Sequence, residues 1–282
     1  MTPFWKSIRK TKTNQPTHQW PLDGISGRQD NAIVEGSAYS FATSTAPSRF
    51  SNLTQRLQRT WEVSNTERVT KGAGIDNMAD YQKMKALKGI TIDLEHALIT
   101  GSFASGSTSA ARRMTGALNY VTSGVYSFAS YANYTAMGAA LIETLFNGQI
   151  KVSWANGGDP DSVLVGPALK AGISAFAGVN STKFTKAELG AIKNTVGYYE
   201  GDFGTVELIL SRDMINAAAS DCWMLVYQND GYYAAVLDPI HHIPTEEVGA
   251  SVSGLGGVIE GEVTLENRKP QNAIVSRTWQ NS

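Results

Sequence analysis

Residues 51–63, SNLTQRLQRTWEV, alternate in a way that is typical of a β-strand. The odd-numbered face carries Leu53, Leu57 and Trp61, whereas the even-numbered face is polar throughout. This period of two predicts a strand in a half-polar ribbon. A partner strand is predicted at 17–25, THQWPLDGI, and residues 26–49 form a long irregular link between the two. Because an isolated two-stranded ribbon is only marginally stable, we expect this protruding segment to lie on another surface.

Charge is distributed unevenly along the chain. Residues 1–75 carry ten Lys/Arg and five Asp/Glu, a net +5, whereas residues 76–282 carry fourteen and twenty, a net −6. Such asymmetry suggests an interaction segment that binds nucleic acid or the acidic remainder of a neighbouring copy. The basic residues are spread singly among acids and hydroxyl side chains, which weakens the nucleic-acid interpretation.

Composition sets the outer limits. The 282 residues suggest two domains or one elaborated domain, and 42% hydrophobic content is enough for a core. No run of about 18 apolar residues is present, so no membrane span is expected. A single cysteine, Cys222, excludes an internal disulfide, and its apolar neighbours predict a buried structural thiol.

The clearest predicted helix covers residues 76–100, with Asp76 as its cap and Gly101 at its end. Gly89 is a candidate for a bend. The apolar residues that recur at helical spacing, and so predict its buried face, are Met78, Tyr81, Met84, Leu87, Leu94 and Leu98.

The remaining predicted elements are segregated helices and strands, which indicates the α+β class. They are a helix at 135–154, a strand at 161–167, a helix from Pro167 to Gly178, hairpins turning at 202–204 and 229–231, and a strand at 257–267 with one dry and one acidic face. Residues 272–279 are expected to return antiparallel to that last strand.

The search for chemistry is mostly negative. The glycine cluster at 253–261 lacks the third glycine of a dinucleotide fingerprint, and GISAF (172–176) lacks the closing glycine of a hydrolase elbow. His241 and His242 have nothing at ligand spacing and predict a surface or interface pair. Asp159 and Asp161 flank a proline and predict a turn. We therefore predict no catalytic, cofactor-binding or metal-binding residues.

Seven strings occur in order along the chain: TPFWKSI, THQWPLD, NAIVEGS, PSRFSNLTQ, DSVLVGP, DFGTVELILSRDM and VTLENRKPQNAIV. Together they resemble the major capsid proteins of tailed bacteriophages, from residue 2 to about 275. The resemblance implies the Hong Kong 97-type capsid fold. The parts implied are an N-terminal arm (1–16), an extended loop (17–75), a peripheral domain with a spine helix (76–115), an axial domain (116–250) and C-terminal strands completing the peripheral domain (251–282).

The resemblance also implies a function and partners. The chain would self-assemble, as hexamers and pentamers, into the head shell around the phage genome, and it would be found in the virion after assembly in the bacterial cytoplasm. Further partners would be a portal, cement proteins and double-stranded DNA contacted non-specifically on the inner face, with no cofactor. Family members usually carry residues before the Thr-Pro-Phe stretch, which implies that Met1 is an internal residue.

Subunit contacts are expected at both ends of the basic segment. Phe4 and Trp5 are candidate apolar anchors for a neighbouring or intrachain groove. Arg49, Arg56 and Arg59 are candidates for the seam, because their segment has no obvious intrachain partner. Three alternatives stay open: an encapsulin-like compartment with cargo enzyme, a soluble enzyme such as a hydrolase, and a nucleic-acid-binding protein.

Overall fold

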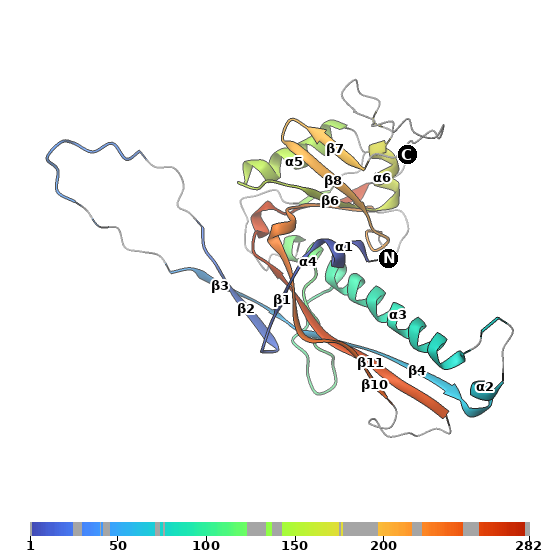
Figure 1. The fold of residues 1–282 in the computed structure, drawn as a ribbon. Coiled ribbons are helices and arrows are strands. Elements are labelled where there is room, and N and C mark those ends of the chain that lie inside the picture. The colour runs from blue at the N-terminus through green and yellow to red at the C-terminus, as the bar shows by residue number, and fades with distance from the viewer. Residues whose placement is uncertain are drawn as a thin grey trace.

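Figure 1 shows the fold of the computed structural model, in which a two-stranded ribbon projects from a body of two sheets and their helices. The structure describes residues 2–24, 30–39, 41, 46–70, 74–75, 77–122, 134–136, 143–174, 176, 197–215, 222–244 and 254–279. The helices are α1 (Pro3–Ser7), α2 (Asn65–Val69), α3 (Met78–Thr100), α4 (Ala117–Thr122), α5 (Glu143–Ala155) and α6 (Pro167–Ser174), with 3-10 turns η1 (Asn229–Gly231) and η2 (Pro270–Asn272). The strands are β1 (Arg9–Lys12), β2 (Thr17–Leu22), β3 (Ser48–Leu53), β4 (Gln55–Ser64), β5 (Tyr134–Ala136), β6 (Ser162–Val165), β7 (Tyr198–Gly201), β8 (Gly204–Leu210), β9 (Cys222–Tyr227), β10 (Tyr232–Pro244), β11 (Gly254–Asn267) and β12 (Ile274–Trp279).

The first sheet has four strands in the order β1-β10-β11-β4, and α3 runs alongside it (Figure 1). β10 and β4 are antiparallel to β11, and β1 is parallel to β10. Leu57 and Trp61 of β4 pack with Ile259 of β11 against Ala86 and Ile90 of α3. The predicted alternation of this segment is confirmed, because its apolar face lies against the helix.

The second sheet has six strands in the order β5-β12-β9-β6-β8-β7. A cluster of buried side chains joins this sheet to α5 and α6, with Phe146, Val163, Leu169 and Val226 among its members. A larger cluster lies between the two sheets and includes Phe4, Leu94, Leu98, Leu225 and Tyr232. The two sheets are therefore joined by this shared cluster of buried side chains. No helix among the described residues is long and apolar enough to cross a membrane.

Two predicted strand pairings are wrong for one physical reason. The chain was expected to form a hairpin around residues 229–231, but β9 pairs with β12 and β6, whereas β10 pairs with β1 and β11. Likewise, β12 pairs with β5 and β9 and does not return along β11. At η1 and η2 the chain crosses between sheets, and the crossings are joined by the N–H of Arg268, which donates to the carbonyl of Gly231 at 2.8 Å. Turn signals at these positions mark crossings that local sequence cannot distinguish from hairpins.

The ribbon is also shorter than the sequence predicts. β3 pairs antiparallel with β2, whereas β4 leaves the ribbon and pairs with β11. The break falls at Thr54, whose N–H donates to the carbonyl of Pro16 at 2.8 Å. One apparently continuous strand at 51–63 is therefore divided between the ribbon and the first sheet.

The long helix is confirmed, but its predicted buried face is partly wrong. α3 starts after Asn77, whose side-chain oxygen accepts the N–H of Ala79 at 3.1 Å, while Asp76 lies outside the described residues. The buried face of its first half is built from Ala79, Ala86 and Ile90. Tyr81, Met84 and Leu87 are exposed, so the larger apolar side chains face outward there.

Glycines on and after this helix have steric reasons. A Cβ at Gly89 would lie 3.0 Å from the Arg59 guanidinium carbon, so this glycine makes room for an arginine of β4. A Cβ at Gly101 would lie 2.4 Å from the Ala97 carbonyl oxygen, so only glycine fits there.

The predicted helix at 135–154 is correct only in its second part. Residues 134–136 form β5 and the helix starts at Glu143, while residues 137–142 lie outside the described part. α6 starts at Pro167 as predicted, and Gly178 lies outside that part. β7 and β8 form the predicted hairpin at 202–204. The side chain of Cys222 is also outside the described part, although its backbone belongs to β9.

Candidate assembly site: the ribbon, its root and the N-terminal arm

The root of the ribbon is held to the first sheet by buried polar side chains. Trp20 of β2 is buried, and its indole N–H donates to the carbonyl of Asn267 at 3.0 Å. Asn52 of β3 is also buried; its amide donates to the carbonyls of Leu265 at 2.8 Å and Thr115 at 3.1 Å. Its amide oxygen accepts the N–H of Thr115 at 3.0 Å. Because these buried groups are paired, both ribbon strands leave the body in a defined direction.

An ionic pair adds to this attachment. The Nε2 atom of His18 lies 2.8 Å from Oε2 of Glu266, and Arg268 donates to the other oxygen of that carboxylate at 2.5 Å. Burial alone would raise the pKa of Glu266, but the hydrogen bonds with His18 and Arg268 outweigh it, so the pKa is lowered. His18 also stacks on Trp20, with ring centroids 5.5 Å apart. The ribbon root is therefore attached to the first sheet by hydrogen bonds and an ion pair, with a stacked ring pair within the root itself.

Beyond the root, the ribbon presents apolar side chains to solvent. Ile33, Val34, Tyr39 and Phe41 are each 79–95% exposed. Four large apolar residues at nearly full exposure in one short segment mark an interaction surface. The described residues of this tip, 30–39 and 41, carry Asp30 and Glu35 and no lysine or arginine, so the tip itself is acidic.

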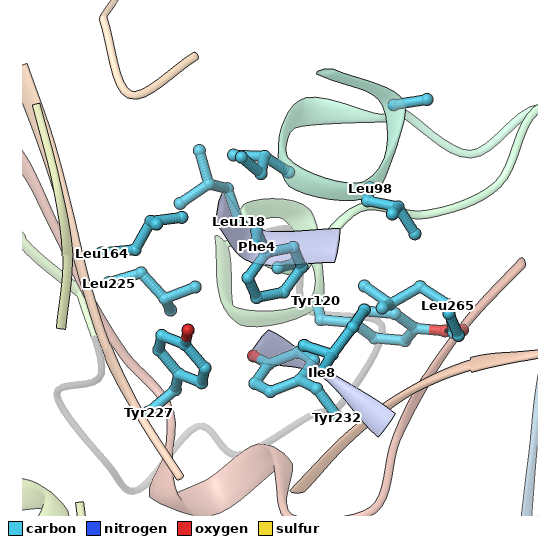
Figure 2. Close-up of a cluster of buried hydrophobic side chains, with 14 of the residues drawn as sticks. Phe4, Ile8, Leu98, Leu118, Tyr120, Leu164, Leu225, Tyr227, Tyr232 and Leu265 are labelled. Atoms are coloured by element: carbon cyan, nitrogen blue, oxygen red, sulfur yellow. Dashed lines mark hydrogen bonds between the residues drawn. The ribbon is translucent and has the colours of Figure 1, made fainter. Parts of the chain in front are cut away.

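The N-terminal arm is anchored inside its own chain. Phe4 is fully buried, and its ring packs edge-on against Tyr227 and Tyr232 with centroids 5.6 and 5.7 Å away (Figure 2). The Glu95 carboxylate of α3 accepts the N–H of Phe4 at 2.7 Å and of Trp5 at 2.8 Å. Burial raises the pKa of Glu95, although the two backbone bonds oppose that shift. Of the two grooves considered for Phe4, the structure therefore places it in the intrachain one.

The arginines considered for the seam differ from one another. Arg56 binds Glu260 of β11, and Arg59 binds both carboxylate oxygens of Asp93 at 2.6 and 2.8 Å. The expectation that their segment lacks an intrachain partner is wrong, because β4 lies between β11 and α3. Arg49 of β3 is exposed and forms no ion pair within the described residues. Of the three arginines, it is the one without an ion pair among the described residues.

A second exposed apolar surface lies on α3. Tyr81, Met84, Leu87 and Ile92 are each 38–52% exposed on the side of the helix that faces away from the sheet. Lys83, Lys85 and Lys88 lie among them on the same helix. Sequence periodicity assigned most of these apolar residues to the core, because it registers spacing and not which of two apolar stripes meets the sheet.

Two contacts that hold the N-terminal arm and the ribbon root join residues far apart in the sequence. Glu95 and Phe4 are 91 positions apart, and His18 and Glu266 are 248 apart. The one signal that could have indicated Glu95 is a glutamate on the apolar side of a predicted helix. No sequence signal joins His18 to Glu266.

The ribbon, the long helix and the two sheets match the Hong Kong 97-type capsid fold, a class of shell-forming proteins. A family model for the SU10 major capsid protein matches residues 1–278. The chain therefore belongs to the SU10 major capsid protein family. It is a structural protein of the virion, and many copies of it build the capsid shell.

Comparison with solved structures supports the same fold. The capsid of a native GTA particle aligns with a TM-score of 0.69 at 13% identity, covering 98% of this chain and 89% of that one. A chain from Gordonia phage Cozz aligns at 0.65 and 11%, covering 100% and 87%. A virus-like particle from Pyrococcus furiosus aligns at 0.52 and 8%, covering 96% and 90%. A search of curated protein sequences found no match.

Proposed function

We propose that each copy of this major capsid protein lays its ribbon across the next copy, in rings that become the hexamers and pentamers of an icosahedral head shell around the phage genome. The observation that carries the proposal is the apolar tip, Ile33, Val34, Tyr39 and Phe41, held away from the body on a root that is hydrogen-bonded to the first sheet. Such a contact between different surfaces of identical chains closes into a ring when the rotation allows it. Burying the tip removes apolar area from water, which favours assembly.

The ion pairs of three arginines support a contact between the ribbon and a neighbouring copy. Arg49 on β3 keeps an unpaired charge within the described residues, whereas Arg56 and Arg59 are used inside the chain. We assign Arg49 to the seam with an acidic neighbouring surface, and Arg56 and Arg59 to holding β4 in place. Trp5 is half-buried beside Lys10, whose ammonium lies 4.7 Å from the ring centroid, and it completes the arm's intrachain seat.

The family and the sheet partners support a division into capsid parts. In this proposal residues 1–16 are the N-terminal arm, the extended loop lies within 17–75, the spine helix within 76–115 and the axial domain within 116–250. Residues 251–282 are the C-terminal strands. The strand pairing changes two of these assignments: β10, within 116–250, pairs in the sheet next to α3, and β12, within 251–282, pairs in the second sheet.

The remaining partners are those that a role in a phage head suggests. We propose a portal at one vertex, cement proteins on the outer surface and non-specific contact between the inner face and double-stranded DNA, with assembly in the host cytoplasm. No reaction is assigned to the chain. An encapsulin-like compartment is the second candidate, because a virus-like particle shares the fold at a TM-score of 0.52.

Electron microscopy of the purified protein tests the proposal. Regular hollow shells with five-fold and six-fold rings are the expected result, and a purely monomeric protein under all assembly conditions would refute it. The contents of shells made in infected cells separate the two candidates. DNA of one length together with a portal supports the phage head, whereas an enzyme without DNA supports the compartment.

A further inference from the structure

Asp238, His241 and Glu260 form a cluster of cation-binding side chains outside the assembly site. Asp238 and His241 lie on β10, and Glu260 lies on β11, in register with His241. One imidazole nitrogen and one oxygen of each carboxylate lie within 4.8 Å of one another. The β10–β11 register shifts on either side of Asp238. Such irregularities re-aim side chains, which explains how residues three apart on a strand reach one spot.

The charges around this cluster are not balanced by the arginines. Asp238 is directly opposite Glu262, and like charges in that position destabilise a strand pair. Arg112 binds Glu262 and Arg56 binds Glu260. Among the described residues, the imidazole of His241 is the only basic side chain within ion-pair distance of Asp238, with Nδ1 3.5 Å from Oδ2. The carboxylate of Asp238 is therefore left to bind a cation other than an arginine.

The donors that remain have the chemistry of a first-row divalent metal site. Both hydrogen bonds from Arg56 go to Oε2 of Glu260, so Oε1 keeps lone pairs for a second partner. Imidazole with two carboxylates is a ligand set that suits Zn²⁺, with water completing four-coordination. Bond lengths of about 2.0–2.2 Å place tetrahedral Zn²⁺ ligands roughly 3.3–3.6 Å apart, so small side-chain movements bring these three atoms into range.

We propose that Asp238, His241 and Glu260 bind one Zn²⁺ ion per chain. The ion links β10 to β11 beyond the point where β1 ends, since β1 pairs only with residues 233–236 of β10. It neutralises the carboxylate of Asp238, which faces Glu262, and connects β10 and β11, the two longest strands of the first sheet. The shell protein would then be stabilised by metal at a position separate from the ribbon root and tip.

Isothermal titration of the metal-free purified chain with ZnCl₂ tests the site. Wild-type protein is expected to bind one more Zn²⁺ per chain than His241→Ala and than Asp238→Asn. His96→Ala is the matched control, because His96 is also exposed and lies 3.1 Å from an aspartate, Asp213, but belongs to no three-ligand cluster among the described residues. Its stoichiometry is expected to equal that of the wild type. Equal stoichiometry in His241→Ala and wild type overturns the proposal.

Two further measurements test the site with other readouts. Arg56→Gln removes the competing cation from Glu260 and is expected to tighten Zn²⁺ binding several-fold; unchanged or weaker binding counts against the assigned ligands. Added Zn²⁺ is expected to raise the thermal unfolding midpoint of wild type and His96→Ala but not of Asp238→Asn. An equal rise in wild type, His96→Ala and Asp238→Asn contradicts the proposal, and circular dichroism confirms that each of these proteins is folded.

Discussion

The Glu95 carboxylate accepts the backbone N–H of Phe4 at 2.7 Å, and so helix α3 holds the N-terminal segment across 91 residues of sequence. The same carboxylate accepts the N–H of Trp5 at 2.8 Å. Both donors are at the start of α1, where backbone N–H groups have no partner within the helix. The arm is thereby part of the subunit core before any neighbour arrives.

Replacing Glu95 with Ala should loosen the arm. The N–H groups of Phe4 and Trp5 would lose their acceptors inside the core, at a cost of about 1–3 kcal/mol in the free energy of unfolding. Hydrogen exchange at these two amides should accelerate. Lys88→Ala, on the exposed side of the same helix, is the control and should leave both amides protected. Unchanged protection in Glu95→Ala would show that the bonds contribute nothing.

Phe4 and Phe41 should behave in opposite ways. Phe4→Ala removes a fully buried ring and should lower the free energy of unfolding by about 3–5 kcal/mol. Phe41→Ala, at 95% exposure, should leave subunit stability within about 0.5 kcal/mol of wild type but impair shell formation. Chemical denaturation measures the first effect, and light scattering during assembly measures the second. Normal shells from Phe41→Ala combined with Tyr39→Ser would contradict the role of the tip.

The arginines should divide into intrachain and neighbour-facing roles. Arg59→Asp should disturb the β4–α3 contact, and Asp93→Arg in the same chain should restore it, because the pair is made within one copy. Arg49→Glu should impair assembly with no change in subunit unfolding. Circular dichroism and electron microscopy on the same samples separate the two roles. If Arg59→Asp leaves the subunit folded but abolishes shells, and Asp93→Arg does not restore them, Arg59 contacts a neighbouring copy instead.

Acid should weaken the ribbon root through Glu266. The folded pKa of Glu266 lies below its unfolded value of about 4.3, so its contribution to stability is complete above that value. This contribution is lost as the pH falls from there through the folded pKa. Between pH 6 and pH 3, Glu266→Gln should therefore lose less of its unfolding free energy than wild type does. Parallel pH curves for the two proteins would show that Glu266 does not drive the loss.

The sequence and the structure agree where the signal is local. The helix at 78–100, the hairpin at 202–204, the helix start at Pro167 and the half-apolar strand around Leu57 and Trp61 follow from spacing and end signals that act within a few residues. The class of protein was likewise available, because seven strings in order along the chain carry the family resemblance.

Tertiary structure alone decided which strands pair, which of the two apolar stripes of α3 is buried and which charges are already used. β9 and β10 are joined by a short turn yet lie in different sheets, Arg56 and Arg59 meet carboxylates from distant segments, and Asp238, His241 and Glu260 meet across two strands. Turn chemistry and periodicity are properties of neighbouring residues, whereas pairing depends on the best burial that the whole chain can reach. The sequence by itself therefore determined the local elements and the kind of protein, and the packed chain decided what remains exposed for assembly.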